Sequence, residues 1–406
     1  MRSCKSCRKS RVFNFFQAQY PLYSLPVSKR DKSAMRLKAG SAVKKLAYGY
    51  CADCGLIFSN IAEHENGVIK KTYEKFYHQI SPLVSGMAAS ELDEFLRETD
   101  IFFKGGVKRV LEIGCFDAYL LFFLRKKGLD VLGIDPSGYG VKIAGEHGIK
   151  VIRAFFPSSK IKKHRFDVIM SRHTIEHVED PFNFIGEQIK ILSAGGIIIF
   201  ETPDVDWSVA NGVSEAFHLQ HPVLLTKKFI IGMLDELGFK YICVKELGWR
   251  RIIACSFRPH DGLISINKAK EDVKSESPKM KRRLHSFQRA IGARTDVIRR
   301  IGSRCRGRKK MAIYGGGSFT GNLLIHEDLS GAKFIVDADS KKWGMEFLHS
   351  DIPIIPPDSL LDGCVDALLI FSQFSDEITR WLRKKGLLKK IKHVYRFFPK
   401  YEVVRP

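Results

Sequence analysis

Two acidic residues close consecutive apolar segments between positions 107 and 140. Glu112 ends the first segment, and Asp135 ends the second one 23 residues later. A helix-like segment separates them, so the pattern predicts a βαβ unit of a nucleoside-binding half-fold. The turn after the first segment reads EIGCFDA. It therefore lacks the G-x-G-x-x-G spacing that lets bare backbone approach a pyrophosphate at a helix N-terminus.

The carboxylates of this unit indicate the charge of its ligand. One carboxylate at the strand tip and another in the turn would repel a pyrophosphate, whereas a ligand with an ammonium and a sulfonium group would be attracted. S-adenosylmethionine meets that requirement, and Asp135 stands where an acidic side chain hydrogen-bonds ribose hydroxyls. An ordinary βαβ unit with a glycine-containing turn is the alternative, which the paired carboxylates disfavour. The predicted cofactor residues of this unit are Glu112, Gly114, Cys115, Asp117, Asp135 and Pro136.

These residues resemble the class I S-adenosylmethionine-dependent methyltransferases, whose first motif often reads E-I-G-x-x-x-G. The sequence departs from the motif at Ala118, where the last glycine usually stands, and at Phe116, where a small or polar residue is common. Further on, RFDVIMSRHTIEHVEDP resembles the fourth-strand segment of the same family. Ser171, Arg172 and His173 end that strand, and ligands bind at this edge of open α/β sheets. The resemblance covers about residues 75–250 and implies a Rossmann-like fold.

The segment from His173 to His177 also spells H-x-x-E-H, the inverted zinc-peptidase motif. That motif needs both histidines on one face of a continuous helix and a third ligand later in the chain. In this sequence His173 directly follows the extended apolar run FDVIM. We therefore interpret Glu176 and His177 as capping and packing residues.

Four of the nine cysteines form two C-x-x-C pairs, Cys4 with Cys7 and Cys51 with Cys54. Each pair places two thiolates on one tight turn, and two such turns together give the tetrahedral sulfur site that zinc prefers. The 43 residues between the pairs exceed the common ribbon spacing. We still predict one bound zinc. Its role would be structural, because four thiolates leave no open coordination position. Unpaired surface cysteines are the alternative.

Paired knuckles ahead of such a domain resemble the bacterial sugar C-methyltransferases and related methyltransferases of polysaccharide biosynthesis. A Pro-Leu pair commonly lies between the knuckles in that group, and Pro21-Leu22 takes this place. The group's acceptor loop resembles Y-x-E-H-x-x-Y-F-S, with the histidine as the proposed base. The resemblance puts His221 in that place, with His218 as the neighbouring alternative. Gln220 and His218 replace the usual glutamate and tyrosine. The sequence therefore supports O- or N-methylation as well as it supports C-methylation.

The sequence divides into four predicted parts. A zinc-binding CxxC/CxxC domain covers residues 1–70, and the methyltransferase domain covers 75–255. A basic helical linker spans 262–310, with apolar residues at near-helical spacing and Pro278 near its start. Residues 311–406 begin with a strand, the glycine cluster 315–317 and a helix, which predicts a small C-terminal Rossmann-like domain. The glycines and Asp337 could hold a nucleotide or only form a tight turn.

The net charge of +23 comes from two segments. Residues 1–55 hold 12 Lys and Arg against 2 acidic residues, and residues 268–310 hold 16 against 4. Three partners compete for this charge: an anionic nucleotide-linked or lipid-linked substrate, an anionic membrane surface in peripheral contact, or RNA. A solvated basic face is the fourth explanation. Few aromatic residues interleave with the linker charges, which disfavours base stacking.

The sequence shows neither a membrane-spanning segment nor a signal peptide, and both observations bear on the expected cellular location. No run of about 18 apolar residues could span a bilayer, so no transmembrane segment is expected. The stretch from Met1 to Arg11 is charged and cysteine-rich, unlike a signal peptide, and an odd number of cysteines suits reduced thiols. We expect a cytoplasmic, zinc-stabilised methyltransferase for a small-molecule, sugar-linked acceptor. An RNA methyltransferase and a degenerate, non-catalytic cofactor-binding scaffold are the alternatives.

Overall fold

The structure is a computed structural model and describes residues 3–21, 25–33, 43–60, 81, 83, 89–274, 277–305, 310–326, 329, 331–398 and 401–404. Its internal contacts group the chain into two compact units. Unit 1 comprises residues 1–14, 48–207 and 220–282, and unit 2 comprises 15–47, 208–219 and 283–406. Both C-x-x-C pairs therefore belong to unit 1, as does the predicted methyltransferase domain except for residues 208–219. The predicted four-part division remains a prediction.

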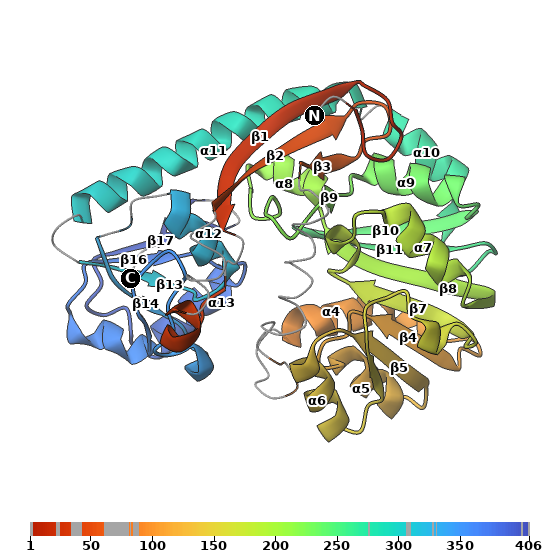
Figure 1. The fold of residues 1–406 in the computed structure, drawn as a ribbon, viewed down its shortest axis with the longest axis horizontal. Coiled ribbons are helices and arrows are strands. Elements are labelled where there is room, and N and C mark those ends of the chain that lie inside the picture. Colours follow the sequence, from red (N-terminus) through yellow and green to blue (C-terminus); the bar gives the residue numbers. More distant parts are fainter. Residues whose placement is uncertain are drawn as a thin grey trace. The chain divides into compact units, whose positions relative to one another are not determined.

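An eight-stranded sheet forms the centre of unit 1 (Figure 1). Its strand order is β12-β10-β11-β8-β7-β4-β5-β6. Strands β8, β7, β4, β5 and β6 are parallel, whereas β11 is antiparallel to both β8 and β10. The strands are β4 (Arg109–Ile113), β5 (Asp130–Asp135), β6 (Val151–Arg153), β7 (Phe166–Arg172), β8 (Leu192–Pro203), β10 (Tyr241–Leu247), β11 (Arg250–Ser256) and β12 (Ile264–Ser265).

Helices cover both faces of this sheet, because alternate side chains of a strand point to opposite faces. Leu111 and Ile113 of β4 pack into one core with Phe184 of α7 and Phe229 of α9. Val110, on the opposite face of β4, packs into a second core with helices α4 and α5. The α-helices that lie wholly within unit 1 are α4 (Ala89–Thr99), α5 (Tyr119–Lys126), α6 (Gly138–Glu146), α7 (Pro181–Ile189), α9 (Lys227–Glu236) and α10 (Ile266–Lys274), and α8 (Val205–Asn211) begins in this unit.

A smaller sheet carries the second cysteine pair and has the order β1-β2-β3-β9. Its strands are β1 (Val12–Pro21), β2 (Val43–Cys51), β3 (Ile57–Ser59) and β9 (Val223–Leu224). The last strand comes from the predicted acceptor loop, more than 150 residues further along the chain. Of the Pro21-Leu22 pair, Pro21 ends β1 and Leu22 lies outside the described residues.

Unit 2 is built on a six-stranded sheet with the order β15-β14-β13-β16-β17-β18. All its neighbouring strands are parallel except β17 and β18. Two buried cores lie on its two sides, as in a Rossmann-like α/β domain. The strands are β13 (Met311–Tyr314), β14 (Ala332–Val336), β15 (Ile354–Ile355), β16 (Ala367–Ile370), β17 (His393–Arg396) and β18 (Glu402–Val404), with helices α12 (Ser318–His326) and α13 (Ser375–Lys384).

The basic segment is helical, as its periodicity predicts. Helix α11 (Ser277–Cys305) buries Leu284, Phe287, Ile298 and Ile301, while its charged residues are mostly exposed. The first part of the predicted linker instead joins the large sheet, because β12 pairs with β10 and α10 packs against α9. The predicted Rossmann-like methyltransferase fold and the C-terminal Rossmann-like domain are thus both present. Within the part of the chain that the structure describes, no helix combines the length and apolarity needed to cross a bilayer.

Candidate functional site

The turn between β4 and α5 has an unusual backbone. Gly114 has φ = 74°, and a β-carbon there would collide with the side chain of Thr174. Phe116 and Ala118 also have positive φ, at 47° and 62°. A left-handed conformation is uncommon for residues other than glycine, and such positions cluster at active sites and ligand clamps. His173, at the end of neighbouring strand β7, is a further case with φ = 45°.

Glycine at position 118 is expected to stabilise the protein. The left-handed conformation costs an L-residue roughly 1–2 kcal/mol, which glycine avoids. Glycine also makes the unfolded chain more flexible, which lowers the free energy of unfolding by about 0.4–1 kcal/mol. We therefore expect Ala118→Gly to raise the free energy of unfolding by about 0.5–1 kcal/mol, measured by urea titration. Ala144→Gly, inside α6, is the control and should lower it. A less stable Ala118→Gly protein would show that the methyl group of Ala118 contributes more through packing.

Asp135 and Asp117 fix the shape of this turn. Asp135 is buried and accepts hydrogen bonds from the backbone amides of Phe116 (2.8 Å) and Ser137 (2.7 Å). Asp117 accepts from the Ser81 hydroxyl (2.6 Å) and the Tyr119 amide (3.1 Å). Burial raises the pKa of Asp135 to about 6, although the two amides oppose the shift. At neutral pH Asp135 is therefore an anion whose remaining lone pairs can accept from ribose hydroxyls.

Asp135→Ala is expected to weaken binding of S-adenosylmethionine. The substitution would remove the ribose acceptor and release the two amides that order the turn. Hydrogen bonds to a charged group contribute about 1.5–3 kcal/mol, which is roughly a 10- to 150-fold rise in Kd. Isothermal titration calorimetry measures this directly, and Asp130→Ala, at the exposed start of β5, is the control. Unchanged affinity in Asp135→Ala would remove Asp135 from the cofactor site.

Glu112 has the properties expected of a counter-charge for the cofactor. Its side chain is buried, and its Oε2 has no hydrogen-bond partner among the described residues. Burial raises the pKa of Glu112 well above its usual value, and the carboxylates of Asp117 and Asp135 add to that shift against the opposing charge of Arg172. An ammonium group bound at this carboxylate would supply the missing partner. The turn therefore fits S-adenosylmethionine. Ser171 Oγ, on the neighbouring strand β7, is a second buried polar atom without a hydrogen-bond partner among the described residues.

The other predicted cofactor residues contribute differently. Cys115 packs into the core beneath the turn, where a β-carbon on Gly133 would meet its Sγ at 2.5 Å. Only the backbone of Cys115 therefore belongs to the turn's surface. Pro136 is half-buried directly after β5. The role of each residue in cofactor binding remains a prediction.

Arg172 and His173 form an ionic network with the end of β8. Arg172 donates to Glu201 Oε1 at 2.6 Å, and His173 lies 3.1 Å from the same oxygen through Nε2. The His173 ring also stacks on Trp249, with 5.4 Å between centroids. Burial disfavours the imidazolium, yet the neighbouring carboxylates of Glu176 and Glu201 prevail and raise the pKa of His173 to about 9. Both predicted residues therefore point along the strand ends toward β8 and β11.

His221 lies beside a second histidine in unit 1. The rings of His221 and His177 meet edge to face with 4.7 Å between centroids, and His221 is buried. His177 Nδ1 lies 2.8 Å from the Gln220 carbonyl, so it must carry a proton, which leaves Nε2 of the neutral ring as an acceptor. Burial lowers the pKa of His177. With Glu176, these histidines place three ligand-type atoms within 4.8 Å of one another.

His218 belongs to unit 2, in the segment 208–219, and is half-buried there. The two histidines named from the sequence therefore fall into different compact units. The structure brings His221 together with His177 and Glu176, which the sequence pattern marked only as capping and packing residues. The H-x-x-E-H segment is split in the same way: its first histidine contacts Glu201, and its second contacts His221.

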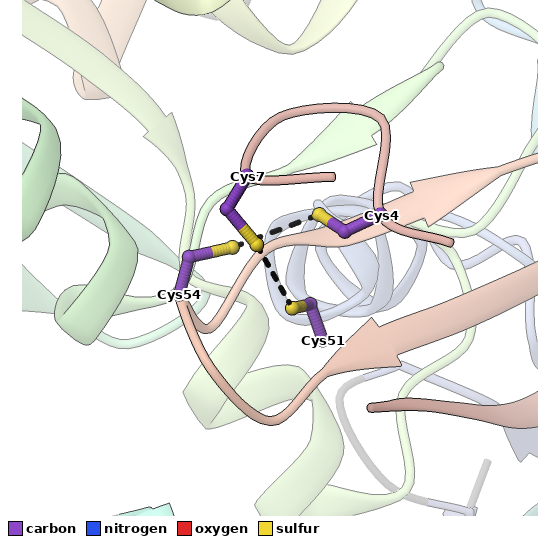
Figure 2. Close-up of side chains that lie close together, drawn as sticks. All are labelled: Cys4, Cys7, Cys51 and Cys54. Carbon is purple, nitrogen blue, oxygen red and sulfur yellow. Dashed lines mark hydrogen bonds between the residues drawn. The ribbon is translucent and has the colours of Figure 1, made fainter. Parts of the chain in front are cut away.

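The four cysteines of the two pairs converge at one point (Figure 2). Cys4 Sγ lies 3.7 Å from Cys54 Sγ, and Cys7 Sγ lies 3.5 Å from Cys51 Sγ. Four sulfurs at about 2.3 Å from a tetrahedral zinc would be separated by about 3.8 Å, so the cluster fits the ion closely. All four ligands would be thiolates, and the site would then be structural. Zinc is compatible with this geometry.

The glycine cluster of unit 2 repeats the arrangement around Asp135. Asp337 accepts hydrogen bonds from the amides of Gly316 (2.7 Å) and Asp339 (2.8 Å). Lys342 Nζ lies 3.0 Å from the same carboxylate and neutralises it. The predicted nucleotide contact at Asp337 would therefore have to compete with, or include, this internal lysine.

Sequence reasoning missed Glu201 as a site residue, its partner Arg250, and Trp249, which stacks on His173. Glu201 is fully buried, lies at the carboxyl end of a parallel strand and bonds to Arg250 as well as Arg172. Burial opposes its ionisation, but these cations and His173 lower the pKa of Glu201 to about 2. The signal was available, because Glu201 ends an apolar strand as Glu112 and Asp135 do.

Comparisons with known proteins identify the family of the central domain. Residues 79–244 match the family described as a methyltransferase domain. An uncharacterized protein of Methanocaldococcus jannaschii is 30% identical over 177 residues, which cover 40% of this chain and 84% of that protein. A ubiquinone biosynthesis O-methyltransferase of Bradyrhizobium is 29% identical over 104 residues, which cover 24% of this chain and 41% of the relative. The chain thus spans less than half of that enzyme's length.

A solved methyltransferase from Archaeoglobus fulgidus aligns with 43% of this chain and 96% of its own, at 17% identity and a TM-score of 0.37. The fold, the acidic cofactor turn and the family match define a class I methyltransferase domain. Residues 79–244 are therefore an S-adenosylmethionine-dependent methyltransferase domain of that class.

Proposed function

We propose that this methyltransferase acts on a small acceptor, a sugar carried by a nucleotide or a lipid or a related metabolite, at carbon or oxygen. The observation that carries the proposal is the pair formed by buried His221 and half-buried His177 beside the strand-end cofactor site. The imidazole pair offers a proton acceptor, which methyl transfer to a hydroxyl or to a carbon beside a keto group requires. The sugar is favoured by the paired cysteine knuckles and by the placement of His221 in the loop.

Bound S-adenosylmethionine would supply an electrophilic methyl group on a sulfonium. Glu112 would hold the ammonium group of the cofactor, and Asp135 would hold its ribose. The turn at Gly114 would let the cofactor come close to the protein backbone. His221 would contact the acceptor and take its proton as the new bond to the methyl carbon forms and the carbon–sulfur bond breaks. A neutral His177 would accept a hydrogen bond from His221 and so support its imidazolium form. The chain's main contribution is alignment of the two reactants.

The four cysteines would bind one zinc that takes no part in the transfer. The protein would work in the cytoplasm, with the basic segments near an anionic acceptor or an anionic membrane surface. RNA is the second candidate acceptor, motivated only by the charge of +23. A non-catalytic scaffold is the third, motivated by Phe116 and Ala118 in the cofactor turn.

Incubation with radiolabelled S-adenosylmethionine separates the three candidates. The purified protein is offered either the small-molecule fraction or the RNA fraction of a cell extract, and S-adenosylhomocysteine is measured. Product from the small-molecule fraction supports the proposal, and mass spectrometry of the labelled compound identifies the acceptor. Labelled RNA, with tight and sequence-selective binding at physiological salt, would replace the sugar by RNA. Binding of S-adenosylmethionine without S-adenosylhomocysteine from either fraction would favour the scaffold.

A further inference from the structure

The loop that carries His221 is held by the cysteine-bearing sheet. We define the acceptor loop as residues 220–226. Within it, strand β9 pairs antiparallel with β3, with Val223 opposite Phe58 and Leu224 opposite Ile57. Strand β3 begins three residues after Cys54, the last cysteine of the cluster. Cysteine cluster and acceptor loop are therefore joined by backbone pairing within unit 1.

Side chains of the same sheet bond to the backbone of the acceptor loop. The hydroxyl of Tyr48, a fully buried residue of β2, donates to the carbonyl of His221 at 2.5 Å. The amide and the hydroxyl of Ser59 both donate to the carbonyl of Pro222, at 3.0 and 3.3 Å. Two consecutive carbonyls of the loop are thus fixed from β2 and β3. A buried acceptor that loses its donor is costly, so these bonds resist displacement of the loop.

The C-terminal end of the loop and the start of α9 bond to the segment that runs from Cys51 to Gly55. Thr226 Oγ1 donates to the Gly55 carbonyl at 2.9 Å. Lys228 Nζ, in the first turn of α9, donates to the Ala52 carbonyl at 3.0 Å. Both carbonyls belong to the chain segment that presents Cys51 and Cys54. A change in the position of those thiolates would be transmitted to Thr226 and from there to the loop.

The cofactor turn has a separate set of supports. Its shape depends on Asp135 from β5 and on Asp117, which bonds to Ser81 and Tyr119. The bonds that join the acceptor loop to β2 and β3 involve neither of these carboxylates. The hydrogen bonds that shape the cofactor turn and those that join the acceptor loop to β2 and β3 are therefore separate sets, while His177 adds a bond to the Gln220 carbonyl at the start of the loop.

We infer that Tyr48 is a positioning residue for His221, and that the cysteine cluster serves the reaction by fixing the acceptor loop. The inference rests on the proposed function in one respect, namely that His221 contacts the acceptor. Loss of the Tyr48 hydroxyl, or of metal from the cluster, loosens residues 220–226 and leaves the cofactor turn unchanged. Acceptor chemistry then fails while cofactor binding persists.

Tyr48→Phe tests the inference without an identified acceptor. Loss of a net hydrogen bond of about 0.5–1.5 kcal/mol should raise amide exchange at Ser59 and in residues 220–226 by about 2- to 12-fold. The pH titration of the His221 ring, followed by nuclear magnetic resonance, should shift. The Kd for S-adenosylhomocysteine should stay within about twofold. Tyr241→Phe removes the same hydroxyl from β10 and is the matched control, which should leave all three unchanged.

Metal removal is the second arm, performed on the full-length protein with a chelator. We expect faster exchange in residues 220–226 and retained binding of S-adenosylhomocysteine. Normal loop exchange and an unshifted His221 titration in Tyr48→Phe would overturn the positioning role. A loss of cofactor affinity as large as the effect on the acceptor loop, in either arm, would also overturn it. The cysteine-bearing sheet would then support the whole domain. Wild-type protein that fails to bind S-adenosylhomocysteine would instead contradict the proposed function.

Discussion

His221→Ala is expected to lose most turnover and to keep its affinity for S-adenosylmethionine. Loss of a general acid–base group typically lowers turnover about 10²- to 10⁴-fold. The imidazole is buried against His177, whereas the cofactor turn is held by Asp135 and Asp117. S-adenosylhomocysteine production with the acceptor fraction measures the first quantity, and calorimetry measures the second.

His218→Ala is the matched control, because it removes the same side chain three positions earlier. It should retain most of the activity. Full activity in His221→Ala, with the loss in His218→Ala instead, would move the base to His218. That result would also weaken the resemblance to the sugar C-methyltransferases, which places His221 in the position of their histidine.

Cys51→Ser is expected to release the metal and destabilise the surrounding sheet. Structural zinc contributes about 10–16 kcal/mol of apparent binding free energy in small domains, which is folding free energy when the apo site is not preformed. Elemental analysis should give one zinc per wild-type chain and none in the variant. Limited proteolysis and hydrogen exchange should show loss of order in residues 3–21 and 43–60.

Cys243→Ser is the control, because this thiol lies on β10 outside the cluster. It should keep the zinc and the protection pattern. A wild-type protein that is fully folded without metal would contradict the zinc assignment, and the cluster would then be four reduced thiols in a stable fold.

The sequence alone indicated the features that depend on local pattern. Alternation of apolar strands and helices predicted the Rossmann-like domain, and acidic residues at strand ends marked Glu112 and Asp135. The C-x-x-C spacing predicted a sulfur cluster, because two residues between cysteines suffice to place both thiolates on one turn. The amphipathic period of residues 284–301 predicted α11. In each case the information lies within a few residues or within one βαβ unit.

Tertiary structure decided what depends on contacts between distant segments. His177 looked like a packing residue until the acceptor loop brought His221 to its ring, and Glu201 acquired its partners Arg172 and Arg250 from β7 and β11. Tyr48 and the His221 carbonyl are 173 positions apart, so no local pattern could join them. The left-handed backbone of Phe116 and Ala118 likewise follows from constraints on both sides of the turn. Strand order and loop packing, which periodicity does not encode, determine these contacts and thereby the acceptor side of the site.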